Sequence, residues 1–422
     1  MADVLEAVLE NGLTVLIRES RGAPVASCWA GYRVGGRNER PGITGISHWV
    51  EHMTFKGSAQ LAKGDIFRLT ARHGGTNNGF TTDDFTIYYE TVPAAQLDVP
   101  LLIESQRMGA ALFDAAETES ERTVIIAERE GNENNPHFLL YERLAATVFQ
   151  EHPYRWPVIG TREDLDRITR DELLAHYRDF YAPNNAVLAI AGDVDAAATL
   201  ERVRHYFEAI PAAKTPNQRP SGEPAQAGER RTEVRHPGAN AFMQVAYRTP
   251  EVGHPDNYPL VMLDAILSGG KPVTWGGGGY MGRTARIYRA VVEERLAASA
   301  GSSYRFSVDP HTFSASLTMR EGVVPEQAEN ALLNVIEGMA AEPPTEAELA
   351  RTLRQTEAQI SYGQEAVTSQ AFALVYFQLL GHWSDVERHI QRLHEVTAAD
   401  VARVAATYLH PANRTVGWFI PS

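Results

Sequence analysis

Two segments of the chain, 228 residues apart, share one residue pattern, and this repeat constrains the fold more than any other feature. Ile168-Thr169 opens the first segment and Val396-Thr397 opens the second. The positions that then match are Tyr177, Phe180, Pro183 and Asn185 in the first, and Ala405, Tyr408, Pro411 and Asn413 in the second. Each segment predicts a helix that runs into an apolar strand, at residues 187–191 and 415–420. The chain is therefore expected to be a duplication.

A second match supports the repeat: Gly31-Tyr32-Arg33 and Ala246-Tyr247-Arg248, at an offset of 215, each end a strand-like segment. Between the halves, residues 213–232 are rich in Pro, Gln, Gly and Glu without hydrophobic periodicity, which predicts a surface linker. We expect two homologous domains, residues 1–212 and 233–422. Irregular alternation of strand-like segments and amphipathic helices predicts an α+β fold, with a mainly antiparallel sheet and helices on one face in each domain.

Composition excludes several classes of protein. A formal net charge of −14 argues against nucleic-acid binding, which needs a basic surface. The most apolar stretch, residues 371–380, is about half of the roughly 20 residues that a membrane-spanning helix needs. The acidic N-terminus lacks the pattern of a signal peptide, which predicts a cytoplasmic protein, or a periplasmic one if a signal peptide has been removed. The single cysteine, Cys28, lies in an apolar run and is interpreted as a buried, unreactive thiol.

The segment His48-Trp49-Val50-Glu51-His52 carries the chemistry. Residues four apart share one face of a helix, so both imidazoles can point at one ion. Glu51 lies on nearly the same side, where it can take a proton from a metal-activated water. The duplication strengthens this hypothesis, because Leu263, Ile266 and Leu267 occupy the matching positions of the second half. A core-facing helix normally places apolar groups there, and burying two histidines and a glutamate is costly without compensation.

A catalytic zinc site needs a third protein ligand, often a carboxylate, and an open position for water. The predicted helix at residues 120–132 offers Glu121 and Glu128, which lie two turns apart on one face. From spacing alone, either carboxylate can be the ligand, and either can be a solvated surface charge.

Residues 45–58 (GISHWVEHMTFKGS), together with ERTVIIAE ending at Glu128, resemble the M16 or pitrilysin-type inverzincin peptidases, and the likeness covers nearly the whole chain. It resembles the small two-domain M16B-like subunits of the mitochondrial processing peptidase beta type, with the LuxS/MPP-like metallohydrolase duplication. The resemblance implies one Zn²⁺ per chain, held by His48, His52 and Glu128, with Glu51 as general base. It further implies that Glu121 supports the site without binding metal.

Two further segments match family motifs. Residues 74–93 (GGTNNGFTTDDFTIYYETVP) imply an edge strand to which a peptide substrate adds at Asn78, Gly79, Phe80 and Thr81. An ordinary strand that follows a glycine turn explains the same residues equally well. Residues 152–161 (HPYRWPVIGT) match a motif that flanks the site. The glycine-rich residues 268–282 lack the Gly-Lys-Ser/Thr ending of a phosphate-binding loop and are interpreted as a flexible lid or a substrate-contacting flap.

One family feature is missing. Active members carry an Arg and, seven residues later, a Tyr that stabilise the oxyanion, but Val292 and Ser299 stand at these positions. The hypothesis is therefore a zinc endopeptidase or oligopeptidase that cleaves unfolded peptides inside a clam-like chamber. A second M16-like subunit would supply the Arg/Tyr pair, giving a heterodimer rather than a homodimer. The alternatives are a non-catalytic structural core subunit and a chamber that binds peptides without cleaving them.

Overall fold

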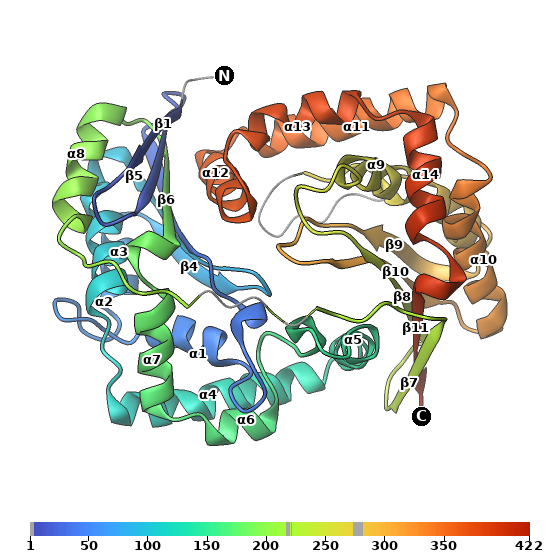
Figure 1. The fold of residues 1–422 in the computed structure, drawn as a ribbon, viewed down its shortest axis with the longest axis horizontal. Coiled ribbons are helices and arrows are strands. Elements are labelled where there is room, and N and C mark those ends of the chain that lie inside the picture. Colours follow the sequence, from blue (N-terminus) through green and yellow to red (C-terminus); the bar gives the residue numbers. More distant parts are fainter. Residues whose placement is uncertain (1–3, 217–219, 221, 273–281) are drawn as a thin grey trace. The chain divides into compact units, whose positions relative to one another are not determined.

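The computed structural model describes residues 4–216, 220, 222–272 and 282–422 (Figure 1). The chain forms two compact units, and neither is one continuous stretch. The first unit comprises Met1–Gly131, Trp156–Ser221 and Gln364–Ser384. The second unit comprises Asn132–Arg155, Gly222–Gly363 and Asp385–Ser422.

The first unit is built on a six-stranded sheet in the order β1-β2-β6-β3-β5-β4. Its strands are β1 (Val4–Val8), β2 (Thr14–Glu19), β3 (Val25–Tyr32), β4 (Thr76–Thr81), β5 (Thr86–Pro93) and β6 (Ala186–Gly192). β2 and β6 are parallel, and the other neighbours are antiparallel. The central strands β3 and β6 are buried almost throughout, because helices lie on both faces of the sheet, and this explains their continuous apolar sequences.

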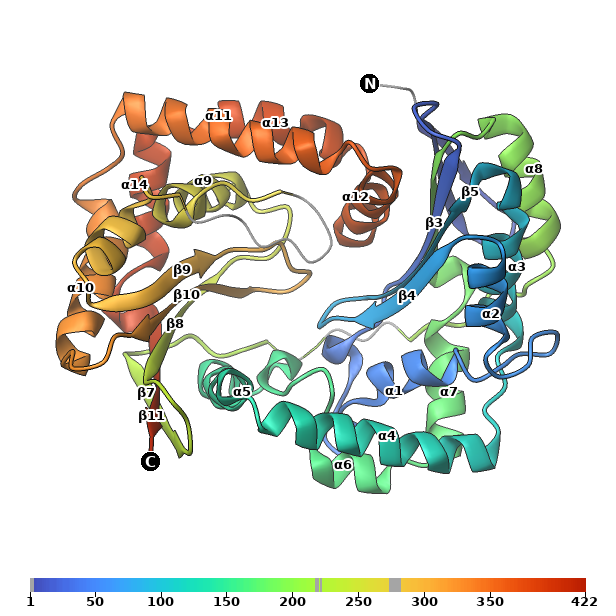
Figure 2. The ribbon, with the colours of Figure 1, turned by 180° about the vertical axis from the view of Figure 1, so that it is seen from behind.

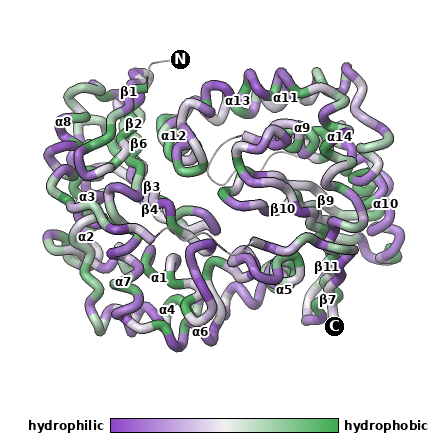
Figure 3. Tube along the Cα trace, viewed as in Figure 1, coloured by the Kyte–Doolittle hydropathy of each residue, from purple (hydrophilic) through white to green (hydrophobic). Residues whose placement is uncertain are grey.

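Helices of the first half cover one face of this sheet, and a single helix from the second half covers the other. On the first face, α3 contacts β3 and β5, and α8 contacts β2; on the second face, α12 contacts β3 and β6 (Figures 1 and 2). The helices are α1 (Ile46–Met53), α2 (Asp65–Arg72), α3 (Asp98–Ala110), α4 (Ala115–Glu133), α6 (Arg162–Arg167), α7 (Arg170–Phe180), α8 (Ala196–Phe207) and α12 (Val367–Leu380). Figure 3 shows how strongly hydrophobic residues gather in β3, β6 and α12.

The second unit has a five-stranded sheet in the order β7-β11-β8-β10-β9. Its strands are β7 (Arg230–His236), β8 (Phe242–Thr249), β9 (Ala297–Ser303), β10 (His311–Met319) and β11 (Arg414–Pro421). α9, α10 and α14 pack with the apolar side of this sheet in one large core, and α5 contacts β7, β11 and β8. The helices are α5 (Pro136–Val148), α9 (Asn257–Ser268), α10 (Pro325–Glu337), α11 (Glu346–Gly363), α13 (Asp385–His394) and α14 (Ala398–Tyr408), with a π-helical turn at Tyr288–Glu293.

The duplication is visible in both the topology and the hydrogen bonds. The order β2-β6-β3-β5-β4 matches β7-β11-β8-β10-β9, and the matching pairs β2/β6 and β7/β11 are both parallel. The side-chain amide of Asn185 donates to the carbonyls of Phe180 and Arg33, and that of Asn413 donates to those of Tyr408 and Arg248. The predicted α+β fold with two related halves is therefore confirmed. The structure differs from the prediction in that helices lie on both faces of each sheet, because α12 and α5 cover the second faces.

The two halves exchange one helix each, which the sequence did not predict. α12 belongs to the second half of the chain but packs in the first unit, and α5 belongs to the first half but packs in the second unit. Glycines allow the close approach: a Cβ on Gly31 would lie 2.7 Å from Leu379 and Val375 of α12, and one on Gly417 would lie 3.0 Å from Leu140 of α5. The predicted domains, residues 1–212 and 233–422 with a linker at 213–232, are each continuous in sequence, whereas each compact unit combines segments of both halves. The predicted boundaries stay a prediction.

Three smaller predictions can be compared with the structure. Cys28 is fully buried, as expected. Among the described residues, no helix is both long and apolar enough to cross a bilayer, and residues 371–380 form part of α12. The predicted flap at residues 268–282 falls largely on 273–281, outside the described residues, and stays a prediction.

Candidate metal centre

The helix α1 presents His48 and His52 on one face, one turn apart, with ring centroids separated by 4.6 Å. It begins after Gly45, whose φ of 86° lies in the left-handed region that glycine adopts without strain. No side chain of its own caps this end. Instead, the buried carboxylate of Glu39 accepts hydrogen bonds from the backbone N–H groups of Gly45 at 2.7 Å and Ser47 at 2.9 Å. Glu39 thus holds the first turn of the helix.

The long helix α4 brings Glu128 to the two histidines. One carboxylate oxygen lies 3.9 Å from Nε2 of His48, and the other lies 3.6 Å from Nε2 of His52. The three groups offer ligand atoms that all lie within 4.8 Å of one another. Two donors of a tetrahedral zinc site, each about 2.1 Å from the ion, are roughly 3.4 Å apart. Two imidazoles and a carboxylate at these separations fit a zinc ion after small side-chain rotations.

Glu121, two turns before Glu128, contacts the other side of His52. Nδ1 of His52 donates to Glu121 at 2.8 Å, and Nζ of Lys56 lies 2.5 Å from the second carboxylate oxygen. Burial raises the pKa of Glu121, but the hydrogen bonds from His52 and Lys56 outweigh this and hold it below its usual value. An ionised Glu121 fixes the ring so that Nε2 faces Glu128, which is the usual arrangement around a metal-ligating histidine.

His48 and His52 differ in their electrostatic environment. Burial and the nearby His52 lower the pKa of His48 to about 3, so its imidazole is neutral at physiological pH. Burial also opposes the charged form of His52, but its hydrogen bond to Glu121 and the nearby Glu51 and Glu128 give it a raised pKa. A neutral imidazole is the form that binds a metal ion, so metal binding at His52 competes with protonation of its ring.

Glu51 is 7% exposed and lies on the same helix as the histidines. The hydroxyl of Thr81 donates to its carboxylate at 2.7 Å. Burial raises the pKa of Glu51, and the Thr81 hydrogen bond offsets part of that effect. A carboxylate with a raised pKa beside a candidate metal is suited to accept and return a proton near neutral pH.

The strand β4 holds the four residues expected to bind substrate. β4 is the last strand of its sheet and pairs only with β5 among the described strands, so one edge is available to an added strand. Asn78 is exposed and Phe80 is buried. A Cβ on Gly79 would lie 2.8 Å from the ring of Tyr88 and 3.2 Å from that of Phe55. Gly79 therefore permits close aromatic packing.

Sequence reasoning missed several residues that support α1. Arg107 is fully buried, donates to Glu104 at 2.9 Å and lies 3.7 Å from Glu90. It also donates, over 3.1 Å, to the hydroxyl of Thr54, which follows the last residue of α1. Its guanidinium also lies over the rings of Phe55 and Tyr88. Arg107 and Glu39 belong to segments without a periodic or motif-like spacing to the HWVEH sequence, so only long-range contacts could reveal them.

The second unit has no counterpart of this centre at the matching positions. Leu263, Ile266 and Leu267 are buried in the core of the second unit. Val292 lies in the π-helical turn and Ser299 lies on β9. The hydroxyl of the nearby Tyr304 donates to Asn257, and Arg305 contacts His311 at 3.4 Å.

The fold and the donor set define a class: a duplicated α+β protein with a candidate metallohydrolase centre. Residues 14–162 match the family model described as insulinase (peptidase family M16), and residues 167–356 match the one described as peptidase M16 inactive domain. The chain belongs to peptidase family M16.

Relatives from bacteria agree with this assignment. The zinc protease PqqE of Helicobacter pylori is 26% identical over 92% of this chain and 86% of its own length, and the uncharacterized zinc protease YmxG of Bacillus subtilis is 26% identical over 86% and 83%. The crystal structure of a protease from Helicobacter pylori has a TM-score of 0.93 at 25% identity, with both chains fully covered. The periplasmic protease PqqL of Escherichia coli shares the fold, with a TM-score of 0.79 at 18% identity over 99% of this chain and 48% of PqqL.

Proposed function

We propose that this chain is a zinc-dependent endopeptidase or oligopeptidase that acts on unfolded peptides. The convergence of His48, His52 and Glu128 beside Glu51 carries this proposal. The two imidazoles and the Glu128 carboxylate would hold one zinc ion, which supplies Lewis acidity when bound. Glu51 takes a proton from the attacking water and returns it to the leaving amine. Thr81 holds the Glu51 carboxylate in place, and Glu121 with Lys56 holds the ring of His52.

The exposed edge of β4 supports an extended peptide as substrate. An unfolded segment can pair with this edge through main-chain hydrogen bonds, whereas most main-chain groups of a folded protein are already paired within it. Residues 78–81 therefore form the proposed substrate-binding strand, and Thr81 links that strand to the general base.

Val292 and Ser299, at the positions of the family's Arg/Tyr pair, support a divided active site. We propose that a second M16-like subunit provides the pair and that the working enzyme is a heterodimer. The same two residues also favour one alternative function, a subunit that binds peptides without cleaving them.

One set of measurements separates these functions. The purified chain and its Glu51→Gln variant are analysed for bound zinc and for cleavage of an unfolded protein, alone and with a second M16 chain that carries the Arg/Tyr pair. We expect one zinc per chain in both proteins, and cleavage only by the unsubstituted chain with its partner, since loss of a general base costs about 10²- to 10⁴-fold in rate. Full cleavage by the chain alone would refute the heterodimer, and cleavage by Glu51→Gln would refute the role of Glu51. Zinc binding without cleavage in any combination would favour the peptide-binding alternative.

A further inference from the structure

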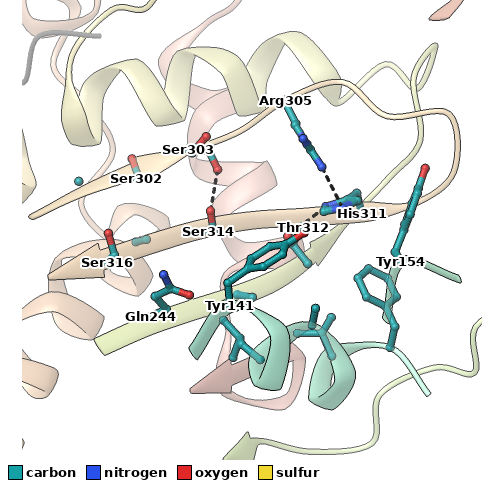
Figure 4. A pocket seen from close by; sticks show the side chains of 17 residues that line it. Tyr141, Tyr154, Gln244, Ser302, Ser303, Arg305, His311, Thr312, Ser314 and Ser316 are labelled. Carbon is teal, nitrogen blue, oxygen red and sulfur yellow. Dashed lines mark hydrogen bonds between the residues drawn. The ribbon is translucent and has the colours of Figure 1, made fainter. Parts of the chain in front are cut away.

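The second unit contains a cavity of about 530 Å³ beside the α5-facing side of its sheet (Figure 4). Small polar residues of β8, β9 and β10 form its floor, and α5 with the segment after it forms its wall. The floor side chains are Gln244, Ser303, Thr312, Ser314 and Ser316.

The duplication supplies an internal comparison for this cavity. At the offset of 215, Gln244 of β8 matches Trp29 of β3. Gln244 pairs across the sheet with Ser316, and Trp29 pairs with Tyr89. In the first unit, Trp29 and Tyr89 stack with centroids 4.3 Å apart, and Phe372 of α12 meets Trp29 at 5.3 Å. Three aromatic rings thus fill the space between sheet and exchanged helix that Gln244 and Ser316 leave open in the second unit.

The rest of the sheet face shows that the opening is local. Where α5 covers the sheet, the contacts are apolar: Leu140 packs with Phe242 and Phe419, and Leu144 packs with Ala246. Hydroxyl-bearing residues begin at β10, where Thr312, Ser314 and Ser316 point to the α5-facing side because Phe313 and Leu317 point into the core. One sheet face therefore has an apolar half under a helix and a polar half at a cavity.

The cavity wall is aromatic and rigidly held. Phe149 and Tyr154 are each 2% exposed, and the rings of Tyr154 and His311 lie 4.6 Å apart. The predicted motif at residues 152–161 contributes to this wall. Nε2 of His152 lies 3.2 Å from the carboxylate of Asp309, whose backbone N–H donates to the hydroxyl of Tyr154.

We propose that this cavity binds an aromatic side chain of a peptide. The ligand's ring would take the space that Trp29 and Tyr89 fill in the first unit and would pack against Phe149 and Tyr154. The serine and threonine hydroxyls would bind the peptide's main-chain groups. None of the described lining residues is acidic, so the cavity offers no carboxylate to a basic residue beside the aromatic one. The inference rests on the proposed function only in taking a peptide as ligand, because no residue of the metal centre takes part.

Binding can be measured without cleavage, using the full chain with the Glu51→Gln substitution. The probe is a capped Ala-Phe-Ala peptide with fluorine on its ring, followed by ¹⁹F NMR, with capped Ala-Ala-Ala as competitor. We expect binding of the aromatic peptide that the alanine peptide does not displace. Ser316→Tyr fills the cavity and is expected to weaken binding by about tenfold or more, since it displaces a buried aromatic ring. Thr318→Tyr is the matched control, because Thr318 lies two residues further on the same strand and does not line the cavity, and its binding is expected to be unchanged. Equal loss in both variants, or no loss in Ser316→Tyr, would overturn the proposal.

A second measurement needs no substitution in the cavity. A peptide carrying benzoylphenylalanine is cross-linked to the chain with light, and the labelled residues are identified by mass spectrometry. Labels on residues 141–154 or 301–316 support the cavity, and labels confined to β4 and α1 contradict it. A failure of the peptidase proposal would appear as absent cleavage or zinc, and would leave these labels unchanged.

Discussion

Glu121→Gln is expected to weaken zinc binding less than Glu128→Gln does, although both carboxylates project from α4. One carboxylate oxygen of Glu128 lies 3.9 Å from Nε2 of His48, and the other lies 3.6 Å from Nε2 of His52. Replacing Glu128 therefore removes a proposed metal donor. Glu121 contacts Nδ1 of His52 and Nζ of Lys56. Its replacement removes a charge that orients a donor, but leaves an amide oxygen that can still accept from His52.

The expected magnitudes follow from these contacts. Loss of the outer partner of a ligating histidine typically weakens metal binding by about 10- to 100-fold. Zinc sites held by four protein ligands bind with roughly 10 to 16 kcal/mol, or roughly 3 to 4 kcal/mol for each ligand. Loss of one ligand is then about 10²- to 10³-fold. We expect Glu128→Gln to exceed Glu121→Gln by about tenfold.

The assay is a zinc titration of each metal-free protein against a fluorescent chelator. Thermal unfolding of the metal-free variants is the control. The Glu128 side chain is 43% exposed, so its substitution is expected to change stability without metal by no more than about 0.5 kcal/mol. Equal losses of affinity in the two variants, or a larger loss in Glu121→Gln, would refute the assignment of Glu128 as the third donor.

Three further predictions concern stability. Arg107→Met leaves Glu90 and Glu104 buried without their cation and is expected to destabilise the chain by about 3 to 5 kcal/mol in urea unfolding; a loss below about 1 kcal/mol would contradict this. Gly31→Ala places a methyl group 2.7 Å from Leu379 and Val375 of α12, and it is expected to lower the free energy of unfolding by about 1 to 3 kcal/mol. Gly417→Ala is expected to lower it less, because the nearest contact there is 3.0 Å, and the reverse order would contradict the packing. Burial, with a smaller effect of Arg392, lowers the pKa of His389 to about 4, below its unfolded value of about 6.5. As the pH falls, His389 therefore takes up a proton in the unfolded chain before it does so in the folded one. Its contribution to the free energy of unfolding is fully present above about pH 6.5 and decreases by about 2 kcal/mol between pH 7 and pH 4.5. The unfolding midpoint of His389→Gln should therefore depend less on pH over that range, and an unchanged dependence would rule out this contribution.

Local sequence was enough to identify the repeat and to nominate two of the three proposed metal donors. The spacing of His48 and His52 is a property of one helical turn, and it depends on no distant part of the chain. The repeated helix-to-strand segments likewise carry their own signals, since Thr169 and Thr397 each form a capping box with the residue three positions later. Neither inference required knowledge of the packing.

Choosing between Glu121 and Glu128 was different. Their spacing puts both on one face of α4, and helical periodicity cannot say which of them faces the imidazole Nε2 atoms. The family resemblance favoured Glu128, and the structure brings Glu128 to both rings and Glu121 to Nδ1 of His52. The same limit applies to Thr81, whose hydroxyl contacts Glu51, because a contact between residues 30 positions apart depends on how β4 packs against α1.

The sequence by itself determined that the two halves are related, that a helix covers residues 120–132 and strands cover 187–191 and 415–420, and that a histidine pair shares a helix face with a glutamate. Only the tertiary structure decided that α5 and α12 are exchanged between the halves, that Glu39 and Arg107 hold the ends of α1, and that a cavity opens where Gln244 and Ser316 replace an aromatic pair. The physical reason is range: helix and strand patterns arise from residues a few positions apart, whereas packing partners are selected by the shape and polarity of surfaces that meet only after the chain has folded.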